Sequence, residues 1–82
     1  MMEAKRLYDE GKMNEVIKII AEVSPEKRTI EMRRMLAWAL FHLKMYGPSL
    51  EEASKLHQEG DDKIIELIKQ IMKNISEEDF AS

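Results

Sequence analysis

Apolar residues recur at intervals of three and four along almost the whole chain, and no stretch alternates between apolar and polar residues with a period of two. Intervals of three and four place side chains on one face of an α-helix, whereas a half-buried strand requires the period of two. The pattern therefore predicts an all-α protein, a compact bundle of about five helices with short connections. We expect these helices over residues 2–10, 13–23, 25–46, 50–59 and 62–74.

Glycine and proline mark where the predicted helices end and begin. Gly11, Gly47 and Gly60 each follow a predicted helix, in the position where a left-handed residue commonly ends one. Pro25 and Pro48 each stand near a predicted start, where the missing amide hydrogen costs nothing. We therefore expect positive φ at Gly47 and Gly60.

Polar side chains support two of these starts. Ser24 directly precedes Pro25, and Ser49 precedes Glu52 by three residues, as in a capping box. We expect Ser49 to cap the fourth helix and Asn74 to end the last one.

The helix predicted over residues 25–46 is amphipathic only in its first half. Its main apolar face comprises Met32, Leu36, Ala39, Leu40 and Leu43. The opposite stripe begins with Lys27, Glu31 and Arg34 and continues with Trp38, Phe41 and Met45. Because a helix that is apolar on all sides is usually buried on all sides, we expect this long helix to lie at the centre of the bundle. The first two helices would cover one side, and the last two would cover its C-terminal half.

The composition disfavours several classes of protein. The 82 residues include no cysteine, carry a formal net charge of −3 and contain no apolar run long enough to span a membrane. The negative charge disfavours general binding to nucleic acid or to anionic membranes, and the first residues lack the apolar core of a signal peptide. We expect a soluble, monomeric single domain over residues 1–82 that requires no partner, nucleic acid or membrane. Nothing in the sequence assigns its localisation.

Charge is distributed unevenly along the chain. Residues 26–46 carry five basic and two acidic side chains, whereas residues 47–82 carry four basic and nine acidic ones. The basic cluster spreads around its predicted helix, whereas a helix that reads DNA groups its contact residues on one face. The cluster comprises Lys27, Arg28, Arg33 and Arg34. We expect it to pair with the acidic C-terminal segment.

The sequence offers no constellation of residues for catalysis or metal binding. His42 and His57 lie on different predicted helices, and neither has a second ligand at a suitable helical spacing. Most paired carboxylates, such as Asp61-Asp62, fall in first turns, where the helix dipole stabilises them. No serine has a nucleophile motif, and no glycine-rich phosphate loop occurs. We therefore expect no catalytic residue, cofactor or metal site, and no enzymatic activity.

A turn at Gly11 is flanked by Leu7 on one side and by Asn14-Glu15-Val16-Ile17 and Ile20 on the other. This arrangement resembles the helix–turn–helix of a tetratricopeptide repeat, which has a large residue in its first helix, glycine at the turn and an acidic-small-apolar step opening its second. The small packing positions of a second, longer hairpin would be Ala37 and Ala53. The resemblance implies a small interaction module that binds a peptide or helix, although Val16 stands where that family prefers alanine.

The helix starts and stops also resemble those of computationally designed helical proteins. They include a Ser-Pro-Glu start, a Gly-Pro-Ser-Leu-Glu-Glu start and glycine stops, in a chain with no cysteine and a single tryptophan. This resemblance implies a stand-alone de novo fold without biochemical activity, which is our first expectation. The tetratricopeptide-repeat-like protein–protein interaction module is the alternative.

Trp38 separates these two expectations. As a core residue it would pack against the aliphatic ridge Ile64, Ile68, Ile71 and Ile75 of the last predicted helix, as a stand-alone fold requires. As a binding residue it would form an exposed contact patch for a partner protein with Phe41 and Met45. The sequence favours the core position.

Overall fold

The computed structural model describes residues 2–81, with side chains from residue 3 to residue 76. The α-helices in this part are α1 (Met2–Asp9), α2 (Met13–Ala21), α3 (Ile30–His42), α4 (Tyr46–Gln58) and α5 (Ile65–Ala81). Two 3₁₀-helices, η1 (Pro25–Lys27) and η2 (Asp62–Ile64), precede α3 and α5. No strand occurs among the described residues, so the predicted all-α class with about five helices is confirmed.

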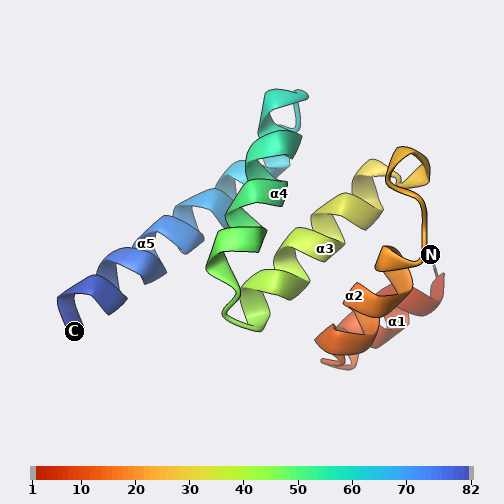
Figure 1. Cartoon of the computed structure of the whole chain (residues 1–82), viewed down its shortest axis with the longest axis horizontal. Coiled ribbons are helices and arrows are strands. Elements are labelled where there is room, and N and C mark those ends of the chain that lie inside the picture. The colour runs from red at the N-terminus through yellow and green to blue at the C-terminus, as the bar shows by residue number, and fades with distance from the viewer. Residues whose placement is uncertain (1, 82) are drawn as a thin grey trace.

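Successive helices lie beside one another in a flattened row that measures 38 × 28 × 18 Å. In Figure 1, α1, α3 and α5 run in one direction and α2 and α4 run in the other. Each helix packs against the next, and α3 contacts α1, α2 and α4, which confirms its predicted central position. It is not the longest helix, however, because α3 has 13 residues and α5 has 17.

The buried side chains form two clusters, one on each side of α3. The first joins α1, α2 and α3 and comprises Leu7, Val16, Ile20, Met32, Leu36, Ala39 and Leu40. The second joins α3, α4, η2 and α5 and comprises Ala37, Ala53, Leu56, Ile64, Leu67 and Ile71. α3 therefore supplies four of the five residues of its predicted main face to the first cluster, all except Leu43, and the small residue Ala37 to the second.

Three helix ends share one kind of turn, in which a residue with positive φ follows the last helical turn. These residues are Gly11 (82°), Lys44 (62°) and Gly60 (101°). The next amides, those of Lys12, Met45 and Asp61, donate to the carbonyls of Leu7, Leu40 and Leu56 at 2.9, 2.9 and 3.0 Å. This Schellman arrangement satisfies carbonyls that a helix end leaves free.

The hairpins α1–α2 and α3–α4 repeat the same backbone geometry 33 residues apart. Gly11 corresponds to Lys44, and the second helix begins at Met13 in one hairpin and at Tyr46 in the other. The residues before those starts have nearly equal angles, φ −89° and ψ 66° in the first hairpin and φ −89° and ψ 69° in the second. The two hairpins are therefore equivalent at their turns, although their helices differ in length (8 and 9 residues in the first, 13 and 13 in the second), and α5 follows them.

The continuous helix predicted over residues 25–46 is wrong at its start. Pro25 begins only a single 3₁₀ turn, because Arg28 adopts an extended backbone with φ −74° and ψ 127°. Thr29 then caps α3 by accepting a hydrogen bond from the Met32 amide at 3.1 Å. A threonine in this position satisfies one of the free amides of the first turn, so the α-helix begins there.

The predicted end of this helix and the predicted start of the next are also wrong. The chain turns at Lys44, and both Gly47 and Pro48 lie in the first turn of α4, where proline needs no amide hydrogen. Gly47 does not have the positive φ that we predicted. Ser49 is not a cap but a buried residue, whose hydroxyl donates to the Ala37 carbonyl at 2.7 Å and ties α4 to α3.

The last helix does not end at Asn74 as predicted, because α5 continues to Ala81. The Asn74 side chain donates to the Gln70 carbonyl at 2.7 Å, a contact within the helix rather than a terminating one. The other predicted helix ends differ from the structure by one or two residues, and the first residues of the predicted helix 62–74 form η2.

Gly60→Ala is expected to destabilise the fold by about 1 kcal/mol, because alanine is strained at positive φ. Gly47→Ala is expected to be neutral or stabilising by up to about 1 kcal/mol, because Gly47 lies in a helix with nothing within 4 Å of an added Cβ. Urea denaturation of the two variants measures both effects. Equal losses of stability in both would contradict the placement of Gly47 inside α4.

Candidate binding groove

A groove runs between α1 and α3, the first helices of the two equivalent hairpins. Its lining consists of Lys5, Tyr8 and Asp9 from α1 and Glu31, Arg34, Met35 and Trp38 from α3. These residues follow helical spacings of three and four, so each helix presents one stripe to the groove. Tyr8, Met35 and Trp38 are half-buried and give the groove an apolar floor between charged side chains.

Aromatic rings cluster at the C-terminal ends of α1 and α3. The His42 ring lies 5.9 Å from that of Tyr8, 6.2 Å from that of Trp38 and 5.8 Å from that of Phe41. Trp38 and Phe41 meet edge to face at 5.9 Å. The Tyr8 hydroxyl and His42 Nε2 are within hydrogen-bonding distance at 3.3 Å. Residues 34 positions apart thus connect the two hairpins beside the groove.

Burial and a neighbouring carboxylate both act on Tyr8. Partial burial raises the pKa of the Tyr8 hydroxyl above its usual value, and the negative charge of Asp9 raises it further. The negative charge of Asp9 is therefore felt at the Tyr8 hydroxyl, at the aromatic end of the groove.

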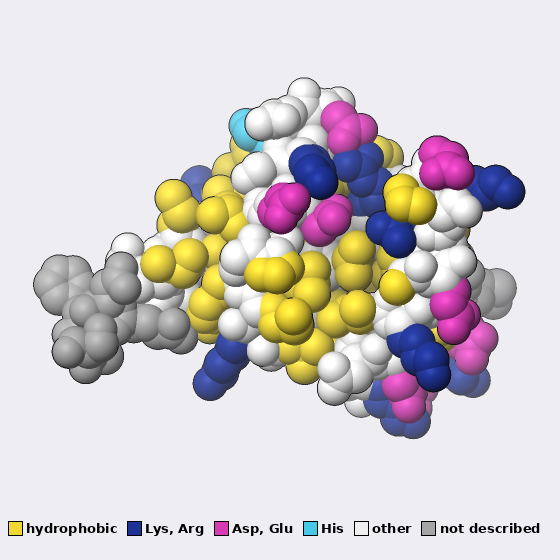
Figure 2. Space-filling view, in the orientation of Figure 1, with side chains coloured by type: hydrophobic (Ala, Val, Ile, Leu, Met, Phe, Trp, Pro, Cys, Tyr) yellow, Lys and Arg dark blue, Asp and Glu magenta, His cyan; other side chains and the backbone are white. Residues whose placement is uncertain are grey.

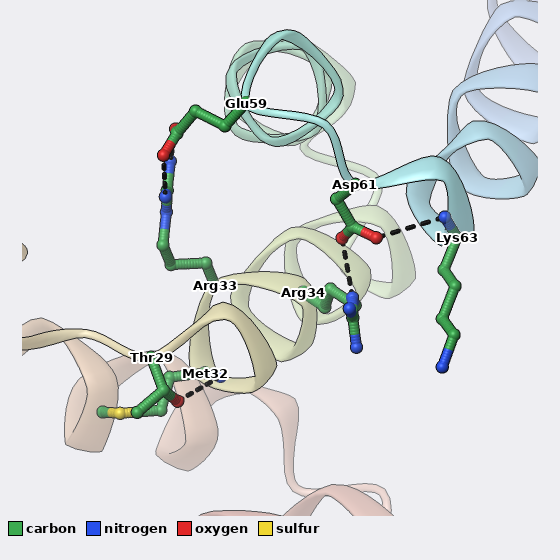
Figure 3. A network of polar contacts seen from close by, with 7 residues as sticks. All are labelled: Thr29, Met32, Arg33, Arg34, Glu59, Asp61 and Lys63. Carbon is green, nitrogen blue, oxygen red and sulfur yellow. Dashed lines mark hydrogen bonds and ion pairs between the residues drawn. The ribbon is translucent and has the colours of Figure 1, made fainter.

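Two ion pairs tie the first turns of α3 to the end of α4 and the segment after it (Figure 3). The guanidinium of Arg33 binds both carboxylate oxygens of Glu59, one of them at 2.9 Å. Arg34 Nε donates to Asp61 Oδ2 at 2.6 Å, and Asp61 also accepts from the Lys63 amide. For these two arginines, the predicted pairing of the basic cluster with the acidic C-terminal segment is confirmed.

Hydrogen bonds from the arginines hold the pKa of both carboxyls below their usual values. The bond from Arg33 is the main cause for Glu59, and the bond from Arg34 is the main cause for Asp61. Asp61 keeps its charge although its side chain is only 6% exposed. The nearly buried carboxylate of Asp61 therefore fixes the orientation of the Arg34 guanidinium in the groove.

Acidification is expected to remove the stability that these pairs contribute. A carboxyl with a lowered pKa in the folded state stabilises the fold above its unfolded pKa, about 4, and this contribution is lost as pH falls through the folded pKa. Asp61→Asn should flatten the dependence of the melting temperature on pH below about pH 5. The matched control is Asp62→Asn at the exposed neighbouring position. Equal pH profiles for Asp61→Asn and the unchanged protein would contradict a stabilising pair.

The residues singled out in the sequence as a contact patch do not all lie together. Trp38 and Phe41 have touching rings and both pack, half-buried, against the second cluster, which includes Ile64 and Ile71. Met45 lies in the turn before α4 and is 45% exposed. Trp38 thus contacts the core and also lines the groove.

Sequence analysis did not identify Tyr8, Met35 and His42 as site residues. In the sequence, Tyr8 belongs to no motif, and His42 is an isolated histidine. Their juxtaposition depends on how the two hairpins pack, which no spacing within one helix reveals. Tyr8 and Met35 are half-buried, which distinguishes them from core residues, whereas His42 is exposed.

A second surface carries hydrophobic side chains on the face that α2 and α4 present to the viewer. Figure 2 shows them from the middle of that face toward the left, over α3, the lower part of α4 and the adjoining part of α5, with charged side chains above and to the right. Ile30 and Met45 are the large apolar residues outside α5 that are exposed among the described side chains. Because the α1–α3 groove combines apolar with charged side chains in a concave surface, we regard it as the better candidate.

Within the described part of the chain, no three histidine, aspartate or glutamate side chains come together as a metal site. His57 is exposed on α4, far along the sequence from the aromatic cluster that contains His42. None of the described helices has the length and apolar character needed to cross a membrane.

Comparison with known proteins identifies no similar protein, so the function has to be inferred from the residues of this chain. No family model, no curated protein and no solved structure matches this chain.

Proposed function

We propose that this protein is a helical-hairpin interaction module that binds a segment of another protein in the α1–α3 groove. The observation that carries the proposal is the groove itself, which two equivalent helices line with half-buried Tyr8, Met35 and Trp38. Binding sites for short segments combine an apolar floor with a few polar groups that fix orientation. The lining charges of Lys5 and Asp9 supply such groups.

The repeated hairpin supports the same function. Stacked helical hairpins form a row in which each unit contacts mainly its neighbours, and equivalent helices create an extended binding surface. The match in turn geometry across 33 residues, from Gly11 to Lys44, supports this kind of architecture here. An amphipathic helix or an extended peptide can lie along such a groove through apolar anchors spaced by one turn.

The competing function is a stand-alone helical fold, of de novo origin, with no binding activity. It is supported by the complete pairing of buried polar groups: no buried side-chain nitrogen or oxygen among the described residues lacks a hydrogen-bond partner. If the protein is a stand-alone fold, no peptide should bind in the groove.

A selection from a random peptide library displayed on phage distinguishes the two functions. We expect selected peptides to shift amide resonances of α1 and α3 in NMR spectra and to bind Tyr8→Ser at least tenfold more weakly, on the order of one lost hot-spot contact. Tyr46→Ser is the matched control, since Tyr46 is also half-buried but lies outside the groove.

Two results would count against the interaction module. If the selection enriches no peptide, the stand-alone fold is the better account of the protein. If peptides are enriched but bind Tyr8→Ser and Tyr46→Ser equally well, the binding surface lies elsewhere. Circular dichroism of both variants establishes that they remain folded.

A further inference from the structure

The aromatic end of the groove has the chemistry of a cation site. Tyr8 and Trp38 both line the groove, and both of their rings lie close to that of His42, at 5.9 and 6.2 Å. Aromatic faces attract cations through the negative face of the ring, most strongly for tryptophan. The guanidinium of arginine is especially suited to such faces because it is planar and weakly hydrated.

The helix ends at this position add negative potential. Tyr8 and Asp9 lie in the last turn of α1, and His42 is the last residue of α3. Because α1 and α3 run in the same direction (Figure 1), the negative ends of both helix dipoles lie on the same side of the molecule. A cation bound there would interact favourably with both ends.

One of the two cations that line the groove is neutralised by a carboxylate outside it. Of its two cations, Arg34 is already paired with Asp61 at 2.6 Å, and Glu31 lies close enough to raise the pKa of Arg34 further. Lys5 and Asp9 take part in none of the ion pairs within the described residues. The lining itself carries two carboxylates and two cations, and Asp61, which lies outside the lining and pairs with Arg34, adds a third carboxylate, in a chain whose net charge is −3.

We infer that the groove recognises a basic segment, in which an arginine side chain lies over Tyr8 and Trp38 and its guanidinium pairs with Asp9. This inference rests on the proposed function and adds the chemical class of the partner. Apolar neighbours of that arginine occupy the floor around Met35. Lysine shares the charge but lacks the planar group, so it binds more weakly at the same position.

The test uses two blocked nonapeptides made of three Leu-Ala-Arg triplets, one with arginine and one with citrulline at each arginine position. Citrulline keeps the shape of the side chain and removes its charge. Fluorescence of Trp38, the single tryptophan of the chain, reports binding. We expect the arginine peptide to bind about tenfold more tightly, the order of effect that a partly desolvated cation over an aromatic ring supplies. Added salt should reduce this preference.

Two variants of the protein test whether the preference for the arginine peptide arises in the groove. Asp9→Asn should reduce it to about threefold or less, because the pairing carboxylate is lost while the rings remain. Glu22→Gln is the matched control: it removes one negative charge from an exposed position at the end of α2, outside the groove, and should leave the preference unchanged.

The outcomes separate this inference from the proposed function. If both peptides bind in the groove with equal affinity, recognition of a basic segment is overturned while the interaction module stands. A preference that Asp9→Asn and Glu22→Gln reduce equally reflects overall charge and also overturns it, as does tighter binding of a peptide with glutamate at the arginine positions. If neither peptide nor any library peptide binds, both proposals fail.

Discussion

Replacing Leu56 with alanine is expected to lower the free energy of unfolding by about 3 kcal/mol, a large share of the total for a domain of this size. The Leu56 side chain is fully buried where α4 meets α3 and α5, in contact with the cluster that includes Ala37, Ile64 and Leu67. Truncation removes these contacts and leaves a cavity that equally buried neighbours cannot fill without moving. Guanidinium denaturation followed by circular dichroism measures the loss.

A matched truncation on the other side of α3 makes this prediction more specific. Leu36→Ala removes a buried leucine from the first cluster, which joins α1, α2 and α3. Because helices in the row contact mainly their neighbours, each truncation should loosen its own side most. Hydrogen exchange should show the greater loss of protection in α4 and α5 for Leu56→Ala, and in α1 and α2 for Leu36→Ala. Identical patterns in the two variants would contradict the division into two clusters.

Periodicity was sufficient to predict the helices and the face that each one buries. Met32, Leu36, Ala39 and Leu40 were all assigned to the main apolar face of one helix, and all four are buried. The buried face of a helix can be predicted from the local sequence, because apolar residues at intervals of three and four lie on one face of that helix. Gly11 and Gly60 were also predictable as helix ends, and both have positive φ.

The breaks on either side of α3 were not predictable from local preferences alone. The sequence favoured Ser24, which directly precedes Pro25, but in the structure Thr29 makes the capping hydrogen bond and Ser24 does not. At the other end, Lys44 adopts the left-handed conformation although Gly47 is three residues away. Gly47 instead lies inside α4, which the hydrogen bond of Ser49 to the Ala37 carbonyl ties to α3. Tertiary packing thus overrode the preference of glycine.

The candidate site depends even more on tertiary structure. Trp38 and Phe41 were recognisable from one helical stripe, since their rings meet within α3. Tyr8 comes to them from another hairpin, and Arg34 is oriented by Asp61 from the segment before α5. The sequence showed opposite charges in these segments but not which residues would pair, because pairing depends on how the helices pack.

Trp38→Ala is expected to lower the free energy of unfolding by about 2 kcal/mol and to abolish peptide binding in the groove. The stability effect is smaller than that of a fully buried tryptophan, for which about 3–5 kcal/mol is typical, because Trp38 is only half-buried against the second cluster. The binding effect arises because the same ring lines the groove. Binding to variants without Trp38 is followed by the NMR shifts of α1 and α3, since the chain has no other tryptophan. In the unchanged protein, Trp38 emission should lie between the buried and water-exposed limits and shift red cooperatively on unfolding.

Two further variants separate the structural role of Trp38 from its binding role. Trp38→Phe retains a ring beside Phe41 and should recover at least half of the lost stability while binding the arginine peptide more weakly, because phenylalanine attracts cations less than tryptophan does. Met45→Ala should change neither quantity, since Met45 is 45% exposed and lies outside the groove. If Trp38→Ala melts like the unchanged protein and native emission is already water-like, the contact with the second cluster is refuted. If it loses stability but binds peptides normally, Trp38 is a core residue, and the binding surface does not include the α1–α3 groove.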